Sequence, residues 1–399
     1  MIVRKRPTSW QSKRFAFFAL CLVATSAMSG HLPAQTETRT ESADAGKGTH
    51  FPEGWNRTTG APQGMQFRGS RVCTGCHSSI ANTQHQTPMG QASAAADRST
   101  ILTEHPTLTY RDGPYELRIE RQGDKEIYSA KDGNHIVSVP LLWAFGQGVA
   151  GQTYIYEKLG NYYESRVSYY PEIGGLDLTT GHSPEIPPTL EEALGRPMTK
   201  EEVTKCFTCH TSEDVFNGKL EVDHLQPGVT CENCHGPGSQ HLKALSPENL
   251  QNDKFHEWNI LNPARLDPAD LNDFCGTCHR STREVLAAKI QGIRNVRFQP
   301  YRLDNSRCYD PADKRITCLA CHDPHVNLVT DLQSYDAKCL ACHVNKNEKS
   351  TPIRSAPPCS IATANCVSCH MPKLALPGAH YKFTDHYIRI DHANAPYPD

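Results

Sequence analysis

The chain has 399 residues, of which 41 are basic and 43 are acidic, so its formal net charge is −2. This balance argues against a nucleic-acid-binding protein, because such proteins carry a clustered excess of Lys and Arg. Hydrophobic residues make up only 38% of the chain, and 27 Gly and 28 Pro favour loops over long elements. The 17 Cys are an unusual number for a chain of this length and require an explanation.

Residues 1–34 are typical of a secretory signal peptide. Basic residues up to Arg14 are followed by an apolar stretch from Phe15 to Met28 and then by small residues. The stretch is shorter than the roughly 20 apolar residues of a membrane helix. Cleavage would remove five basic and no acidic residues and change the formal charge from −2 to −7. The sequence therefore predicts a periplasmic or extracellular protein that is not integral to the membrane after cleavage.

Residues 35–104 combine a lead-in with a first functional motif. Thr, Gly, Glu and Pro without hydrophobic periodicity predict a flexible linker over 35–70. The following segment, 71–104, contains Cys73-Thr74-Gly75-Cys76-His77. The Cys-x-x-Cys-His pentapeptide attaches c-type haem, because its two thiols form thioether bonds to the haem vinyl groups and its imidazole binds the iron. We interpret 71–104 as a first haem segment.

Residues 105–172 predict a β-rich insert. Tyr115, Leu117 and Ile119 alternate with polar residues, and turn signals such as Gly123-Asp124 separate this run from later apolar runs. Residues 146–151 match the Gly-x-Gly-x-x-Gly pattern of dinucleotide-binding proteins. No helix-forming context follows this pattern, so we interpret it as a turn within the insert.

Residues 173–399 predict short helices joined by loops around six further motifs. Thr199 and Glu202 form a capping box before the second motif, and Asp267-Pro268 and Ser246-Pro247 are helix-start signals. The predicted fold class is therefore mainly α with low regular secondary structure. We expect a multihaem cytochrome c fold wrapped around its haems, with a small antiparallel β insert.

The pentapeptide occurs seven times, whereas the composition predicts about 0.04 occurrences by chance. Structural zinc sites combine two Cys-x-x-Cys pairs, but seven pairs cannot be divided evenly, and zinc does not explain the constant histidine. We therefore predict seven haem c groups. The expected thioether residues are Cys73, Cys76, Cys206, Cys209, Cys231, Cys234, Cys275, Cys278, Cys318, Cys321, Cys339, Cys342, Cys366 and Cys369. The expected proximal iron ligands are His77, His210, His235, His279, His322, His343 and His370.

Enough further histidines are present to give every haem a second, distal ligand. His241 follows the third motif after Gly236-Pro237-Gly238, and His325 follows the fifth after Asp323-Pro324, so turns can direct both toward a neighbouring haem. We favour these two and His386 as distal ligands, because neutral imidazole binds iron readily. Four other histidines are either distal ligands or ordinary histidines that bind no iron. These are His85, His105, His182 and His224.

Other sulfur-containing residues have less defined roles. Cys308 and Cys359 are the two cysteines outside both the motifs and the signal segment, and whether they form a disulfide remains open. Met89 is a possible thioether ligand that we interpret as a packing residue.

Three segments carry a resemblance to a known family. They run from Gly228 to Gly238, from Cys318 to His325, and from Cys366 to Pro372 followed by Phe383-Thr384-Asp385-His386. They resemble bacterial secreted multihaem c-type cytochromes, in particular heptahaem members that are sometimes fused to tetratricopeptide repeats. No such repeat is visible in this chain. The resemblance implies stacked and perpendicular haem pairs with distal histidines from elsewhere in the chain, and it supports His241, His325 and His386 in this role.

The resemblance also relates the chain broadly to multihaem nitrite reductases and hydroxylamine oxidoreductases. Ammonia-forming nitrite reductases typically replace one motif histidine by lysine, whereas all seven motifs here end in His. This difference argues against nitrite reduction.

Three functions remain as hypotheses. We favour electron transfer through a row of haems, with redox proteins or small electron donors and acceptors as partners. The alternative is an oxidoreductase in which one open haem acts on a small nitrogen or sulfur compound, with unknown catalytic residues. A docking module is the third hypothesis. The sequence does not indicate an oligomeric state.

Overall fold

The computed structural model describes residues 60–213, 215–216, 219–223, 225–251, 259–343, 359–392 and 395–398. All of these residues lie within one compact unit of the chain. The predicted signal peptide, most of the linker and His224 therefore lie outside the described residues. Within the described ranges, no helix combines the length and apolar character needed to cross a membrane.

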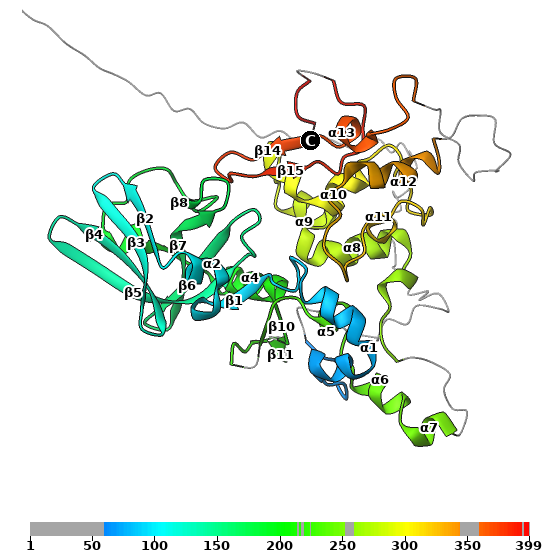
Figure 1. The fold of residues 1–399 in the computed structure, drawn as a ribbon, viewed down its shortest axis with the longest axis horizontal. Coiled ribbons are helices and arrows are strands. Elements are labelled where there is room, and N and C mark those ends of the chain that lie inside the picture. The colour runs from blue at the N-terminus through cyan, green and yellow to red at the C-terminus, as the bar shows by residue number, and fades with distance from the viewer. Residues whose placement is uncertain are drawn as a thin grey trace, which may run out of the picture. The chain divides into compact units, whose positions relative to one another are not determined.

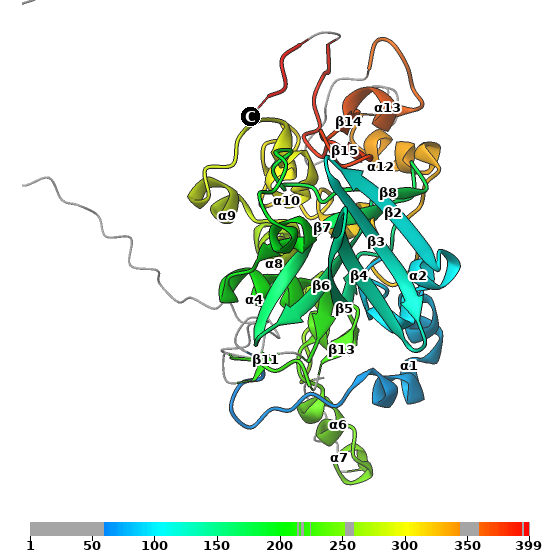
Figure 2. The same ribbon diagram turned by 90° about the vertical axis from the view of Figure 1, so that its left-hand side faces the viewer.

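An antiparallel sheet of nine strands dominates the first half of the described chain (Figures 1 and 2). β2 to β8 follow one another in chain order, while β1 pairs with β5 and β9 pairs with β7. β2 also contacts β8, so the sheet curls until the first and last strands of the series β2 to β8 approach each other. The strands are β1 (Ser93–Ala95), β2 (Thr107–Asp112), β3 (Tyr115–Gln122), β4 (Lys125–Asp132), β5 (His135–Phe145), β6 (Gln152–Lys158), β7 (Asn161–Tyr170), β8 (Gly175–Leu178) and β9 (Gly195–Pro197).

Alternating apolar residues bury one face of this sheet. Leu117 and Ile119 on β3 are 0% and 1% exposed, and they pair in register with Ala130 and Tyr128 on β4. Complete burial of a large apolar side chain contributes about 1.5–3 kcal/mol. The expected turn at Gly123 joins β3 to β4 with φ of +65°, which glycine adopts without strain. The predicted strand pattern is thus confirmed in this region.

The predicted fold class is wrong in its balance of elements. Among the described residues, 34% are helical and 24% lie in strands, so the fold is not mainly α. The β part is a nine-stranded sheet and not a small insert. Strands at Ser93–Ala95 and Gly195–Pro197 join the sheet from outside the range 105–172. Each has only three residues, too few to show alternation in the sequence.

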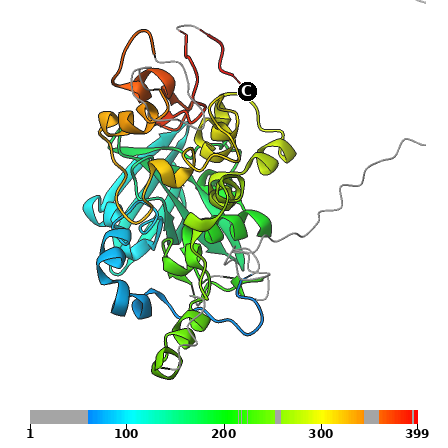
Figure 3. The same cartoon turned by 90° about the vertical axis from the view of Figure 1, so that its right-hand side faces the viewer.

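The helices of the second half are short (Figure 3). The helix-start signals are confirmed, because α4 begins with the Thr199–Glu202 capping box and α8 begins at Pro268. The α-helices are α1 (Ser70–Gln84), α2 (Thr100–Glu104), α3 (Leu190–Leu194), α4 (Lys200–His210), α5 (Cys231–His235), α6 (Ser239–Ala244), α7 (Pro247–Gln251), α8 (Pro268–His279), α9 (Thr282–Ala287), α10 (Gln299–Asp304), α11 (Cys318–Cys321), α12 (Asp336–Leu340) and α13 (Cys366–His370). The 3₁₀ helices are η1 (Ala96–Arg98), η2 (Pro263–Arg265), η3 (Gly292–Arg297) and η4 (Leu332–Tyr335).

Three two-stranded sheets complete the secondary structure of the described residues. β10 (Thr211–Ser212) pairs with β13 (Gln226–Pro227), β11 (Val215–Phe216) pairs with β12 (Lys219–Leu220), and β14 (Lys373–Ala375) pairs with β15 (Lys382–Thr384). The last pair leads directly to His386.

An aromatic cluster packs α4 against the large sheet. Phe207 of α4 is fully buried, and its ring centre lies 5.1 Å from that of Phe145 and 5.7 Å from that of Trp143, both in edge-on geometry. Edge-on aromatic pairs are favourable beyond their area of contact. Because α4 contains the second motif, this cluster fixes the position of that motif relative to the sheet.

Candidate haem-binding sites

Helices present both cysteines of six motifs, which lie on α1, α4, α5, α8, α11 and α13. The sixth motif begins on α12, which ends at Leu340, so Cys342 and His343 lie in the turn that follows. Cysteines three positions apart lie on the same face of a helix, so both thiols of a motif point toward the same side. None of the fourteen motif cysteines is buried or forms a disulfide in the described structure. None of these thiols is therefore consumed by a disulfide.

The motif helices meet in pairs. The first and third motifs lie together, since α1 contacts α5. The fourth and fifth motifs lie together in the same way, since α8 contacts α11. The sixth and seventh motifs meet where α12 contacts α13, and Asp336 at the start of α12 accepts a hydrogen bond from the N–H of Cys366 at 2.8 Å. The second motif lies beside the fourth, since α4 contacts α8.

Three motif histidines are oriented through their Nδ1 atoms. Nδ1 of His210 lies 3.0 Å from the carbonyl oxygen of Ala92, and Nδ1 of His235 lies 2.8 Å from that of Leu261. In His370, Nδ1 lies 2.7 Å from the carbonyl oxygen of Arg389. A carbonyl accepts a hydrogen bond, so Nδ1 carries the proton and Nε2 has the free lone pair. This is the tautomer in which a histidine binds a metal through Nε2.

Two of the favoured distal histidines face motif histidines. The ring centres of His235 and His325 lie 6.0 Å apart with nearly parallel planes, at 11°. Those of His322 and His386 lie 6.2 Å apart at 44°. Two imidazoles that bind one metal from opposite sides, each through a bond of about 2 Å, hold their ring centres about 6 Å apart. Both spacings fit bis-histidine ligation of one iron.

Burial favours the neutral form of these imidazoles, the form that binds iron. It lowers the pKa of His322, and it lowers that of His386 to about 4. Burial also lowers the pKa of His235, and the positive charges that His325, His77 and His241 can carry act in the same direction. The neutral form of all three imidazoles is therefore favoured by burial.

The other candidate distal ligands are not brought to a motif in this way. Nε2 of His105 lies 3.1 Å from the hydroxyl oxygen of Tyr169, and Nε2 of His182 lies 3.0 Å from a carboxylate oxygen of Glu164. In both residues the atom that normally binds iron has another partner, within the region of the large sheet. His85 is exposed at the C-terminal end of α1.

The two remaining expectations concern cysteine and glycine. Cys308 and Cys359 do not form a disulfide. The glycine-rich segment 146–151 connects β5 to β6, and Gly146 has φ of +96°. Its interpretation as a turn within the β region is confirmed.

Sequence reasoning missed one carboxylate that organises the first and third motifs. Glu232 lies inside the third motif and is 1% exposed. Its carboxylate accepts hydrogen bonds from the backbone N–H groups of Arg68, Gly69 and Gly238, at 2.6–3.0 Å. It therefore connects the start of α1 to the turn that precedes His241. Its position between two motif cysteines was the available signal.

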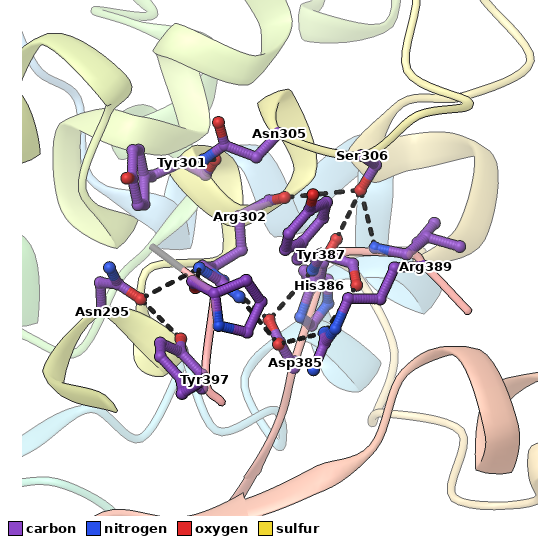
Figure 4. Close-up of polar contacts among 12 residues, drawn as sticks. Asn295, Tyr301, Arg302, Asn305, Ser306, Asp385, His386, Tyr387, Arg389 and Tyr397 are labelled. Carbon is purple, nitrogen blue, oxygen red and sulfur yellow. Dashed lines mark hydrogen bonds and ion pairs between the residues drawn. The ribbon is translucent and has the colours of Figure 1, made fainter. Parts of the chain in front are cut away.

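A second missed group lies around His386 (Figure 4). Asp385 and Arg302 form an ion pair in which both side chains are 0% exposed. Their separation by 83 residues explains why sequence reasoning did not connect them. The adjacency of Asp385 to His386 was the visible signal.

The donor set fits haem c. Cysteine pairs outside any disulfide adjoin histidines, three of which bond to a carbonyl through Nδ1, and two motif histidines face a second imidazole at the spacing that one iron requires. No cluster of three or more His, Cys, Asp or Glu suited to a simple metal ion occurs within the described ranges. These donors suit a covalently attached haem.

Comparison with known proteins agrees with this chemistry. Residues 188–236 match the family described as cytochrome c554 and c-prime, and this segment contains the second and third motifs. No curated protein matches the sequence. Among solved structures, the chain is similar to the outer cell wall cytochrome OcwA, with 16% identity and a TM-score of 0.47 over 81% of this chain and 79% of the other. The family match and the motifs support a multihaem c-type cytochrome involved in electron transfer.

Proposed function

We propose that the chain is a periplasmic or extracellular cytochrome that binds seven haem c groups and transfers electrons among them. Both cysteines of six motifs and the first cysteine of the remaining one lie on helices, and none of the fourteen forms a disulfide, which supports the number of haems. The sequence of residues 1–34 supports export. The acidic charge expected after cleavage and the absence of a basic excess support redox proteins or small redox molecules as partners.

The pairing of His235 with His325 and of His322 with His386 is the observation that carries this function. Bound haem c supplies a one-electron iron couple whose potential depends on its axial ligands. With an imidazole on each side, the iron would have no position left for a substrate, whereas catalytic metal sites keep one open. The two histidine pairs thus support electron transfer over substrate binding.

Contacts between motif helices support transfer over several haems. Four contacts connect the first motif to the third, the second to the fourth, the fourth to the fifth, and the sixth to the seventh. The attachment points of different haems therefore lie close together. A single haem would be enough for a shuttle, so several attachment points held together favour a conduit or a store of several electrons.

Low-temperature EPR of the oxidised holoprotein tests this function. We expect seven low-spin ferric signals that do not change when nitrite, hydroxylamine or cyanide is added. A high-spin signal that shifts on addition of one of these molecules would instead support the alternative oxidoreductase. His325→Gly provides the positive control, because it should open one iron to cyanide. His135→Gly is the matched negative control, since His135 is exposed and contacts Asp132 on the large sheet.

A further inference from the structure

Arg302 and Asp385 form the most completely buried ion pair of the described residues. Nε and Nη2 of Arg302 donate to the two oxygens of Asp385, at 2.8 and 2.9 Å, and both side chains are 0% exposed (Figure 4). Arg302 lies on α10, while Asp385 follows β15. This two-point contact fixes both the distance and the orientation of the segment that contains Asp385.

The surroundings satisfy the remaining groups of Arg302. Nη1 donates to the carbonyl oxygen of Pro398 at 2.7 Å and to Oδ1 of Asn295 at 3.3 Å. The ring centres of Tyr387 and Tyr397 lie 5.0 and 4.6 Å from its guanidinium carbon, where cation–π attraction operates. A buried ion pair contributes little net stability, because removing both charges from water is costly. The complete burial of this ion pair therefore indicates that the pair positions neighbouring residues.

The first histidine positioned by this pair is His386. Oδ1 of Asp385 accepts a hydrogen bond from the N–H of Tyr387 at 3.0 Å. Ser306, just after α10, donates to the carbonyl oxygen of His386 at 2.9 Å and accepts from the N–H of Ile388 at 2.8 Å. The backbone is thus held on both sides of His386, whose imidazole faces His322.

The second histidine is His370 of the seventh motif. Nη1 of Arg389 donates to Oδ2 of Asp385 at 2.6 Å. The carbonyl oxygen of Arg389 accepts from Nδ1 of His370 at 2.7 Å, and its N–H donates to the carbonyl oxygen of the same histidine at 3.2 Å. The carboxylate of Asp385 therefore holds the segment that orients His370 as well.

We propose that Asp385, held by Arg302, is a positioning residue that sets the orientation of His386 and His370 together, so that ligands of the fifth and seventh haems depend on one buried carboxylate. This inference rests on the proposed haem ligation. It predicts that one substitution outside both motifs changes two haem centres at once. A residue that only stabilised the fold would not select these two centres.

The test compares Asp385→Asn with Asp112→Asn in the holoprotein. Asp112 forms the other deeply buried ion pair described, with Arg166, and both residues lie on strands without a motif. We expect D385N to shift the g-values or spin state of two of the seven low-spin EPR signals. D112N should lower the melting temperature but leave all seven signals unchanged. His386→Met, which replaces one ligand, assigns the signal of the fifth haem.

Three outcomes would overturn the proposal: no altered signal in D385N, one altered signal only, or the same alteration in D112N. If D385N does not mature, Arg389→Met decides, because it removes the connection between Asp385 and the segment that orients His370 and should change the signal of the seventh haem. Unchanged signals in R389M would also overturn the proposal. Failure of the proposed ligation itself is recognised separately. If His386 does not bind iron, H386M leaves all seven EPR signals unchanged.

Discussion

Glu232 offers a quantitative test of how the first and third motifs are held together. Its carboxylate accepts from the N–H groups of Arg68, Gly69 and Gly238, and it is 1% exposed. Glu232→Ala removes the acceptor from all three donors. A buried donor without a partner costs about 1–3 kcal/mol. Three such donors sum to about 3–9 kcal/mol, and single substitutions rarely cost more than about 5 kcal/mol, so we expect a loss of about 3–5 kcal/mol in the free energy of unfolding.

The assay is thermal unfolding of the holoprotein followed by circular dichroism, with EPR of the same sample. E232A should melt several degrees lower than the wild type, and Glu232→Gln should lie between them because its amide oxygen still accepts. Glu172→Ala is the control, since Glu172 is exposed in the turn after β7. We also expect altered signals from the first and third haems in E232A. An E232A protein that melts like E172A would refute the assignment of Glu232 as the anchor of α1.

Three further predictions address the candidate ligand His241, the protonation of Glu213 and the packing of α4 against the large sheet. His241→Gly should remove one of the seven low-spin EPR signals, whereas His105→Gln should remove none, because Nε2 of His105 contacts Tyr169. Burial raises the pKa of Glu213 to about 7, with nearby Glu232 and Cys231 acting in the same direction. The pKa of a glutamate in an unfolded chain is about 4.3. Because the pKa of Glu213 in the folded chain is higher, the stabilising contribution of its protonated form is complete below about pH 4 and is lost as the pH rises through about 7. Melting temperatures measured over this range should therefore depend less on pH in Glu213→Gln than in the wild type, and an equal dependence would contradict the shift. Phe207→Ala should destabilise the fold by about 3–5 kcal/mol in denaturant unfolding, because it leaves a cavity between the sheet and α4; a loss below about 1 kcal/mol would contradict this packing.

The local features of the fold were predictable from the sequence where residues close in the chain determine them. The alternation of Tyr115, Leu117 and Ile119 predicted β3, and Thr199 with Glu202 predicted the start of α4. The extent of the sheet was not predictable, because β1 and β9 are short and pair with distant strands. Hydrogen bonds to such partners leave no periodic pattern in a three-residue segment.

The candidate sites show the same division between local and distant information. The seven motifs are continuous in sequence, so their cysteines and histidines could be named directly. The turn after His322 indicated that His325 would reach a neighbouring haem, and the structure places it opposite His235. The part played by Arg302 was beyond sequence reasoning, because only folding brings it to Asp385, 83 residues away.

Intact-mass spectrometry of the exported holoprotein tests the central claim most directly. The account predicts a chain that carries the mass of seven covalently bound haems after denaturation, since thioether bonds survive unfolding. A chain with fewer haems would contradict the account, as would one that loses all of its cofactor on denaturation.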